Sequence, residues 1–344
     1  MKRVALGLSG GVDSAVAAIL LKEQGYEVVG ITFKFTKDFD ASDAIRVAAA
    51  LNIEHHVIDY EKIFKEKVID KFLADYKKGI TPNPCIMCNK EVKLNFLYQE
   101  MHNKNCVKIA TGHYAKIIDG NLYCSTNKEK DQTYFLCEVN KEIINKLLLP
   151  LEGLEKETVR RIAALNNLSV ATKKDSTDIC FITKTFKDFI NKELEPSQGK
   201  IIEVNTNKIL GTHNGLSNYT IGQRRGLNIG GTKDRIFVVG KDTKENILYV
   251  TIGNEENLNS NSCLIEKVNL FNNEKPITVE AVFRYHAQPV TAKLEWLNDN
   301  EVILNYDSVR AVTPGQACAF YHGDECLGGG IIKSVRKDDN LWNQ

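Results

Sequence analysis

The stretch Ser9-Gly10-Gly11-Val12-Asp13-Ser14 decides the fold of this chain. It follows residues 2–8, which are typical of a short buried strand, and its last two residues begin the segment 13–24, whose apolar side chains recur at helical spacing. Two adjacent glycines let the backbone turn so that several N–H groups point into one concavity, and the helix dipole adds positive potential there. The stretch, called the phosphate loop below, therefore predicts an anion-binding turn between a strand and a helix.

The side chains of the phosphate loop suit the same ligand. Ser9 and Ser14 can donate hydrogen bonds to phosphate oxygens, and Asp13 can either cap the helix or approach a magnesium ion. An ordinary Gly-Gly turn with Asp13 as its N-cap is the structural alternative. The sequence has no Walker-type loop and no Gly-x-Gly-x-x-Gly that opens a helix. Neither γ-phosphate hydrolysis nor a dinucleotide cofactor is therefore indicated.

Outward from this loop, strand and helix patterns alternate through the first half of the chain. Strands are expected at 27–33, 55–58 and 107–112, and helices at 42–51, 61–78, 89–103, 155–166 and 185–192. Residues 115–118 and 122–125 flank Asp119-Gly120, which predicts a hairpin. The alternation predicts an α/β fold with a doubly wound parallel sheet.

After about Pro196 the pattern changes to short alternating runs that are separated by glycine-rich turns. Such spacing predicts a small central β-rich domain followed by a C-terminal β-barrel. A polar, asparagine-rich segment at 258–262 is expected to be the linker between them. The predicted domains are 1–196, 197–258 and 259–344.

Composition and charge exclude several classes of protein. The 344 residues include 45 Lys and Arg against 44 Asp and Glu, which excludes a protein with a polybasic tail. The balance does not exclude nucleic-acid binding, because such binding needs only a local basic face. No apolar run approaches the roughly 18 residues of a membrane helix, and the loop glycines interrupt the signal-like start. Nine cysteines without a secretion signal indicate a reducing compartment. We expect a cytoplasmic protein without a membrane partner.

The second motif is Thr81-Pro82-Asn83-Pro84-Cys85-Ile86-Met87-Cys88-Asn89. Its prolines predict a rigid extended loop. Cys88 is expected at the N-terminus of the helix at 89–103, where the dipole lowers a thiol pKa from roughly 8.5. That placement suits a nucleophile. A third thiol, Cys180, ends a dense polar run, Asp175-Ser176-Thr177-Asp178-Ile179-Cys180-Phe181, that is more typical of a site than of a core.

Several interpretations of these cysteines compete. A zinc deaminase needs His-x-Glu, which neither His55 nor His56 supplies, and structural zinc needs a second cysteine pair, which the chain lacks. No metal ligands are therefore assigned. A buried inert pair and an iron–sulfur cluster on Cys85, Cys88 and Cys180 stay open beside the catalytic thiol.

Together these motifs resemble the tRNA-specific 2-thiouridylases, which belong to the ATP pyrophosphatase superfamily. The resemblance spans nearly the whole chain, and its blocks are 7–14, 83–89, 110–115, 130–135, 175–181, 219–227, 284–285 and 314–316. It implies a tRNA-uridine 2-sulfurtransferase that uses ATP and Mg²⁺. ATP would adenylate the 2-carbonyl oxygen of the wobble uridine, and persulfide sulfur would replace that oxygen, giving 2-thiouridine, AMP and pyrophosphate.

The resemblance also implies the roles of individual residues. Cys88 would be the nucleophile and Cys180 the persulfide carrier, and the reaction would leave a disulfide between them. ATP would contact Gly7, Leu8, Ser9, Gly10, Gly11, Val12, Asp13, Ser14, Phe33 and Gly112. The tRNA would contact Asn83, Pro84, Cys85, His113, Lys130, Asp131, Gln132, Arg284, Tyr285 and Gln316. The implied partners are tRNA and a sulfur donor, which is a cysteine desulfurase acting directly or through sulfur-relay proteins.

Two rival functions belong to other classes. A small-molecule amidating enzyme with the same phosphate loop would leave Cys88, Cys180 and the β-rich half unexplained. A non-catalytic tRNA-binding or nucleotide-binding protein would need neither these thiols nor Asp13. The pairs Arg224-Arg225 and Arg284-Tyr285 supply the cations and the aromatic ring that RNA binding uses.

Overall fold

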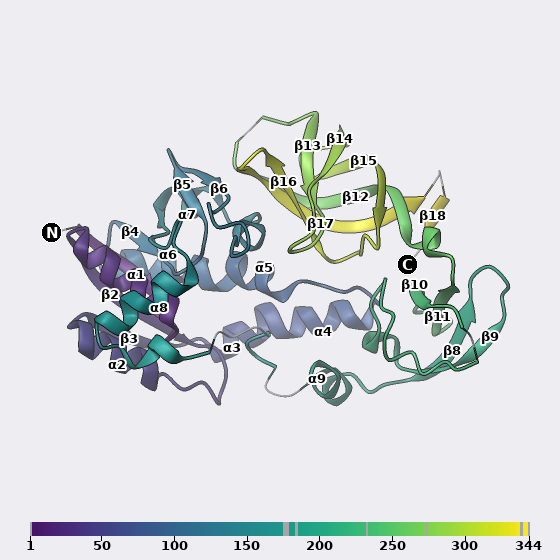
Figure 1. Ribbon diagram of the computed structural model, residues 1–344, viewed down its shortest axis with the longest axis horizontal. Coiled ribbons are helices and arrows are strands. Elements are labelled where there is room, and N and C mark those ends of the chain that lie inside the picture. The colour runs from purple at the N-terminus through teal and green to yellow at the C-terminus, as the bar shows by residue number, and fades with distance from the viewer. Residues whose placement is uncertain are drawn as a thin grey trace.

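The computed structural model describes residues 2–174, 179–182, 185–231, 233–272, 274–337 and 340–342. These residues form a five-stranded, a four-stranded and a nine-stranded sheet. Figure 1 shows the N-terminal sheet and its helices at one end of the molecule, the four-stranded sheet at the other end and the largest sheet between and above them. Within the described ranges, no helix is long and apolar enough to cross a membrane.

The N-terminal sheet is parallel and has the strand order β3-β2-β1-β4-β7. Its strands are β1 (Lys2–Gly7), β2 (Tyr26–Lys34), β3 (Glu54–Asp59), β4 (Lys108–Ala110) and β7 (Leu147–Leu148). Side chains of β1 alternate between two cores, since Val4 and Leu6 pack with α1 (Val12–Glu23) and Ala5 packs on the opposite face. A sheet covered on both faces confirms the predicted doubly wound α/β fold.

Helices of the first half lie close to their predicted positions, with one exception. They are α2 (Ser42–Leu51), α3 (Glu61–Phe64) continuing through a π turn (Lys65–Ile69) into α4 (Asp70–Lys77), α8 (Lys156–Leu165) and α9 (Phe186–Glu193). The short helix α7 (Lys141–Lys146) was not predicted. The exception is the helix expected at 89–103. It begins at Pro84 as α5 (Pro84–Cys88), passes through the π turn η2 (Asn89–Lys93) and ends as α6 (Leu94–Asn103).

The early start of α5 has a local cause. The Asn83 side chain accepts hydrogen bonds from the N–H groups of Cys85 (3.1 Å) and Ile86 (3.4 Å), and Pro84 occupies the first helical position. Asparagine is among the preferred N-caps, and proline fits the first turn because it has no N–H to satisfy. The prediction of a rigid extended loop as far as Cys88 is therefore wrong, since the extended segment ends at Asn83.

The second half is all β, as predicted. The four-stranded sheet contains β8 (Gln198–Glu203), β9 (Ile209–Asn214), β10 (Ile236–Asp242) and β11 (Ile247–Ile252). The barrel contains β12 (Asn259–Leu270), β13 (Thr278–Val282), β14 (Val290–Trp296), β15 (Glu301–Arg310), β16 (Ala317–His322) and β17 (Glu325–Lys337), with β18 (Asn340–Trp342) on β17. Pairing of β12 with both β15 and β17 closes it. The exact domain boundaries stay predictions.

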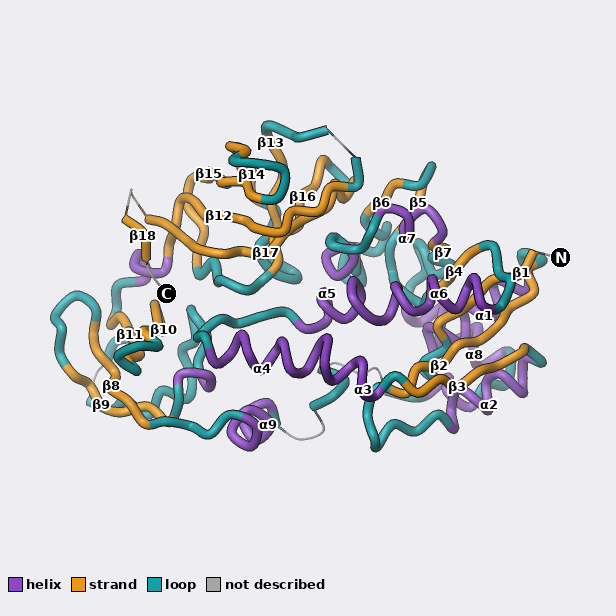
Figure 2. Tube along the Cα trace, turned by 180° about the vertical axis from the view of Figure 1, so that it is seen from behind, coloured by secondary structure: helices purple, strands orange, loops and turns teal. Residues whose placement is uncertain are grey.

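Contacts across the three parts hold the cysteine-bearing helix in place. The predicted hairpin forms as β5 (Lys116–Ile118) and β6 (Asn121–Tyr123), and β6 pairs with β17 of the barrel. The segment between α4 and α5 is held from both sides, because Gln316 donates to the Thr81 carbonyl at 2.7 Å and Lys241 donates to the Gly79 carbonyl at 3.0 Å. Figure 2 shows α4 running between the N-terminal sheet and the four-stranded sheet, beside α5 and α6.

Candidate active site

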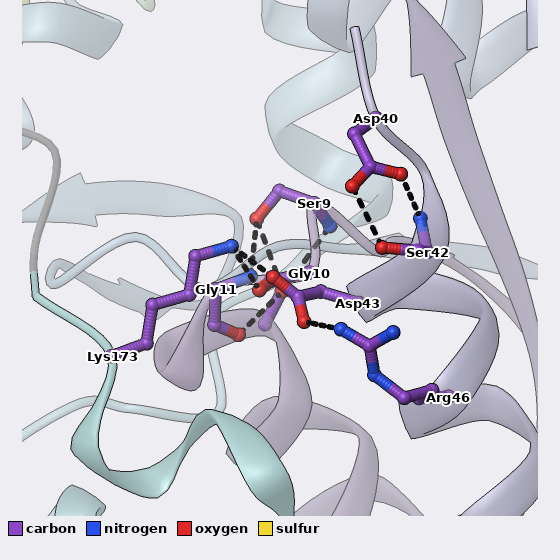
Figure 3. Close-up of polar contacts among 9 residues, drawn as sticks. Ser9, Gly10, Gly11, Asp40, Ser42, Asp43, Arg46 and Lys173 are labelled. Carbon is purple, nitrogen blue, oxygen red and sulfur yellow. Dashed lines mark hydrogen bonds and ion pairs between the residues drawn. The ribbon is translucent and has the colours of Figure 1, made fainter.

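The phosphate loop connects the end of β1 with the start of α1. Gly10 has a φ of +73°, and a Cβ there would come within 2.9 Å of the Ala44 nitrogen, so the turn requires glycine. The two serines brace the loop. Ser14 Oγ donates to the Gly11 carbonyl at 3.1 Å and lies 3.1 Å from Ser9 Oγ. Figure 3 shows this turn in close-up.

Asp13 does not cap the helix, so the first of the two roles predicted for it, that of an N-cap, is wrong. Gly11 is the N-cap residue, and no side chain caps this helix. The Asp13 carboxylate instead accepts from Tyr114 Oη at 2.7 Å and from Lys156 Nζ, which lies 2.8 Å from both carboxylate oxygens. Lys156 is not among the predicted site residues, because local sequence patterns contain no signal for a contact between residues so far apart in the chain.

The remaining residues predicted for ATP lie around the same edge of the sheet. Gly112 packs on the phosphate loop so closely that a Cβ there would lie 2.9 Å from the Asp13 carbonyl carbon and the Ser14 nitrogen. Phe33 is near the end of β2, and its buried ring stacks on Phe35 with centroids 5.7 Å apart. Residues 7–14, Phe33 and Gly112 are thus brought together, although their contacts with ATP stay a prediction.

Cys88 lies inside the helix and not at its N-terminus, so the predicted effect on its pKa is reversed. The residue is 7% exposed, and burial raises the pKa of the Cys88 thiol to about 12. The wrong prediction follows from the helix start, because the favourable end of the dipole lies one turn earlier, at Pro84. Desolvation also raises the pKa of Cys85 and of Cys180, although both residues are exposed at the surface.

The three thiols lie near one another and near Lys93. The charge of Cys180 raises the pKa of Cys85 and of Cys88, and the charge of Cys85 also raises the pKa of Cys88. The Lys93 ammonium lowers the pKa of all three thiols against the effect of desolvation. Lys93 ends the π turn η2, a widened turn of the kind that is frequent at functional sites. Lys93 is not among the predicted site residues, although it is a cation only five residues after Cys88 in the sequence.

Cys180 is positioned by its neighbour. The Phe181 ring is buried among Phe64 and Phe72, with centroid distances of 5.8 and 5.5 Å. Four residues of the polar run, Asp175, Ser176, Thr177 and Asp178, lie outside the described residues. All three cysteines are free thiols, and among the residues with described placement no group of three or more side chains is arranged to hold a metal ion. The iron–sulfur alternative therefore gains no support.

Most of the predicted tRNA residues of the first domain have partners within the chain. Gln132 Oε1 accepts from the Tyr114 N–H at 3.0 Å, and Asp131 accepts from the Ser125 N–H at 2.6 Å. His113 lies 2.8 Å from Thr111 Oγ1, and burial lowers its pKa to about 3, so its ring is neutral. Asn83 caps α5, Pro84 is buried, and Lys130 is exposed.

Of the predicted tRNA residues in the barrel, one is exposed and two contact the first domain. Arg284 is exposed and lines a hollow of about 350 Å³ together with His286 and Arg310. The Tyr285 ring packs on Phe135 of the first domain with centroids 4.4 Å apart. Gln316 is the residue that donates to the Thr81 carbonyl described above. Arg224 and Arg225, noted for their charge, are exposed in a turn of the central domain.

Known protein families and curated relatives match nearly the whole length of the chain. Three family models cover it in order: a tRNA methyl transferase HUP domain over 2–184, a tRNA methyl transferase PRC-barrel domain over 187–252 and an aminomethyltransferase beta-barrel domain over 260–332. A tRNA-specific 2-thiouridylase MnmA of Mycoplasmopsis synoviae is 41% identical and covers 98% of this chain and 97% of its own. Its counterpart in Listeria monocytogenes is 44% identical, with 98% and 96% covered. A solved 4-thiouridine synthetase–RNA complex with bound ATP overlaps 56% of this chain and 49% of its own, at 17% identity and a TM-score of 0.38.

Proposed function

The chain belongs to the tRNA-specific 2-thiouridylase family, and from this premise we propose that it converts the wobble uridine of tRNA anticodons into 2-thiouridine with the use of ATP. One observation carries the proposal. Relatives of that name match 98% of the chain, and the residues that the reaction needs, the phosphate loop and the thiols, lie in one domain. The small-molecule amidating enzyme and the non-catalytic binder leave this combination unexplained.

The first step is adenylation of the uridine 2-carbonyl oxygen, with pyrophosphate as the leaving group. The N–H groups at the start of α1 and the loop serines would hold the departing phosphates, since an anion is stabilised at a helix N-terminus. Mg²⁺ would neutralise charge on the phosphates when bound. Asp13 suits it as a ligand, because its carboxylate lies in the loop and is 33% exposed.

The second step replaces the activated oxygen with sulfur. A persulfide on Cys180 would be attacked at its inner sulfur by the Cys88 thiolate, which forms a Cys88–Cys180 disulfide and releases hydrosulfide. Hydrosulfide would then add to C2 of the uridine, and AMP would leave with the oxygen. An external reductant has to restore the two thiols. Exposure of Cys180 supports its role as carrier, because a cysteine desulfurase or a sulfur-relay protein has to reach it.

The environment of Cys88 sets a condition on this step. A thiol whose pKa is about 12 is protonated at neutral pH, and only the thiolate attacks sulfur. Lys93 supplies the opposing effect, as its charge favours the thiolate of each cysteine. The proposed mechanism therefore places Lys93 beside the nucleophile as the residue that helps to ionise it.

The proposal is tested with an unmodified tRNA transcript, ATP, Mg²⁺ and a persulfide source. Mass spectrometry of the digested tRNA is expected to detect 2-thiouridine, and pyrophosphate release is expected to require tRNA. Pyrophosphate release with a small amine acceptor and without tRNA would favour the amidating enzyme. Binding of tRNA with neither product would favour the non-catalytic protein.

A further inference from the structure

Lys173 contacts the phosphate loop from a part of the chain with no assigned role. It follows a short helical turn, Ser169–Thr172, and its ammonium donates to the Gly10 carbonyl at 3.1 Å and to Asp43 Oδ2 at 2.5 Å. Asp43 lies in the first turn of α2 and also accepts from Arg46. Figure 3 shows Lys173, Asp43 and Gly10 converging at the loop.

Asp43 is held firmly in this arrangement. Its Cβ is 2.9 Å from the position that a Cβ on Gly10 would take, so α2 packs directly against the phosphate loop. The hydrogen bond from Lys173 lowers the pKa of the Asp43 carboxyl, which is therefore ionised at neutral pH. The protein thus keeps a negative charge and a cation side by side at the edge of an anion-binding turn.

A phosphate group entering the loop would compete with Asp43 for the same ammonium. The Lys173 side chain is 46% exposed and that of Asp43 is 26% exposed, so a polyanion can reach the pair. Phosphate oxygens are strong acceptors for lysine, and the Asp43 carboxylate would repel them. Asp43 would keep Arg46 as a partner after Lys173 had moved to a phosphate.

We propose that Lys173 is a phosphate-binding residue of the nucleotide site and that Asp43 holds it there until the phosphates of ATP replace the carboxylate. This inference rests on the proposed function, because it concerns the same loop and the same leaving group. Lys156 and Asp13 form a comparable pair at the loop, with the ammonium 2.8 Å from the carboxylate. Lys156 and Lys173 thus each form an ion pair with an aspartate beside the phosphate loop.

A purely structural ion pair makes a different prediction. Pairs between exposed side chains contribute little to stability, so loss of either partner would change binding little, or would weaken it in both variants through a displaced loop. Competition between Asp43 and a phosphate for Lys173 requires that the two substitutions change phosphate affinity in opposite directions. Removing Lys173 removes a ligand of the phosphate, whereas removing the charge of Asp43 removes its competitor.

The test measures binding of inorganic pyrophosphate to the full chain by isothermal titration calorimetry in the presence of Mg²⁺. Lys173→Met is expected to weaken binding about tenfold or more, and Lys173→Arg to restore most of it. Asp43→Asn keeps the shape of the side chain and is expected to tighten binding about two- to fivefold. Lys174→Met, one residue further along an exposed segment, is the matched control and is expected to leave binding unchanged.

Changes of the same sign in Lys173→Met and Asp43→Asn, or no change in either, would overturn the inference. Ser14→Ala separates this failure from failure of the proposed function. If Ser14→Ala loses pyrophosphate binding and Lys173→Met does not, only the role of Lys173 is wrong. If the unaltered protein binds neither pyrophosphate nor ATP, the proposed function is wrong and the inference is overturned with it.

Discussion

The ammonium of Lys156 lies 2.8 Å from both carboxylate oxygens of Asp13, although 143 residues separate the two in the chain. The pair joins the first residue of α8 to the first turn of α1, and Tyr114 donates a further hydrogen bond to the same carboxylate. The Lys156 side chain is only 15% exposed, and the Asp13 carboxylate compensates its charge. The geometry of the phosphate loop therefore depends on a residue far along the chain.

Asp13→Asn should lower tRNA-dependent pyrophosphate release about 100-fold or more. The amide keeps the shape of the carboxylate but loses its charge, so the ion pair with Lys156 and the proposed contact with magnesium are both weakened. Tyr114→Phe removes one hydrogen bond to the same carboxylate and should cost about tenfold or less. A steady-state pyrophosphate assay compares the two variants. Equal activity of Asp13→Asn and the unaltered protein would contradict the assignment of the loop.

Gly112→Ala should weaken ATP binding at least about tenfold, because the added methyl group would meet the main chain of Asp13 and Ser14 at 2.9 Å. Main-chain atoms of the loop would have to move, and the N–H groups would no longer converge. Gly211→Ala is the control, since nothing lies within 4 Å of a Cβ there. Titration calorimetry with ATP measures both. Unchanged affinity in Gly112→Ala would place the nucleotide elsewhere.

Lys93→Met should raise the pH at which the active-site thiols react. The sign follows from charge: the ammonium favours the thiolate, so removing it raises the pKa of Cys180 and Cys88 further. Alkylation by iodoacetamide across pH, read peptide by peptide in a mass spectrometer, measures Cys180 directly. Lys93→Arg should preserve the profile. Cys124, whose pKa depends on burial, Asp131 and Lys128, is an internal control, and an unshifted Cys180 profile would contradict the role of Lys93.

Substitution of single cysteines should separate persulfide chemistry from cluster chemistry. With a persulfide, Cys88→Ser and Cys180→Ser should abolish 2-thiouridine formation and Cys85→Ser should retain most of it, because one thiol carries sulfur and one releases it. Colourless protein with this pattern supports the persulfide mechanism. Comparable loss in all three variants, with an iron–sulfur absorbance under anaerobic conditions that each substitution removes, would favour the cluster.

Arg284→Ala should weaken tRNA binding and lower the slope of log affinity against log salt by about one counter-ion, without changing ATP affinity. The side chain is exposed beside Arg310, which suits contact with phosphate. Lys275→Ala is a control on the same barrel, because Lys275 already pairs with Asp299 at 2.6 Å. Filter binding across a salt series measures both, and an identical slope for Arg284→Ala would remove Arg284 from the RNA surface.

The sequence by itself determined the elements whose signals are local. A strand, two glycines and a helix within about 24 residues were enough to predict the phosphate loop, and alternation of hydrophobic residues was enough for the sheet and the barrel. The same local reasoning misplaced the start of the cysteine-bearing helix. It treated the segment 81–88 as rigid and extended, although Asn83 followed by Pro84 is itself a strong start signal.

Only the tertiary structure decided the electrostatics of the site. The pKa of Cys88 depends on how much solvent the surrounding elements exclude, and no spacing in the chain encodes that amount. Lys156 and Lys173 reach the phosphate loop because α8 and the turn after it pack over α1, which is a property of the folded core. Local patterns arise from neighbours a few residues apart, whereas desolvation and long-range ion pairs arise from chain segments that meet only when the protein folds.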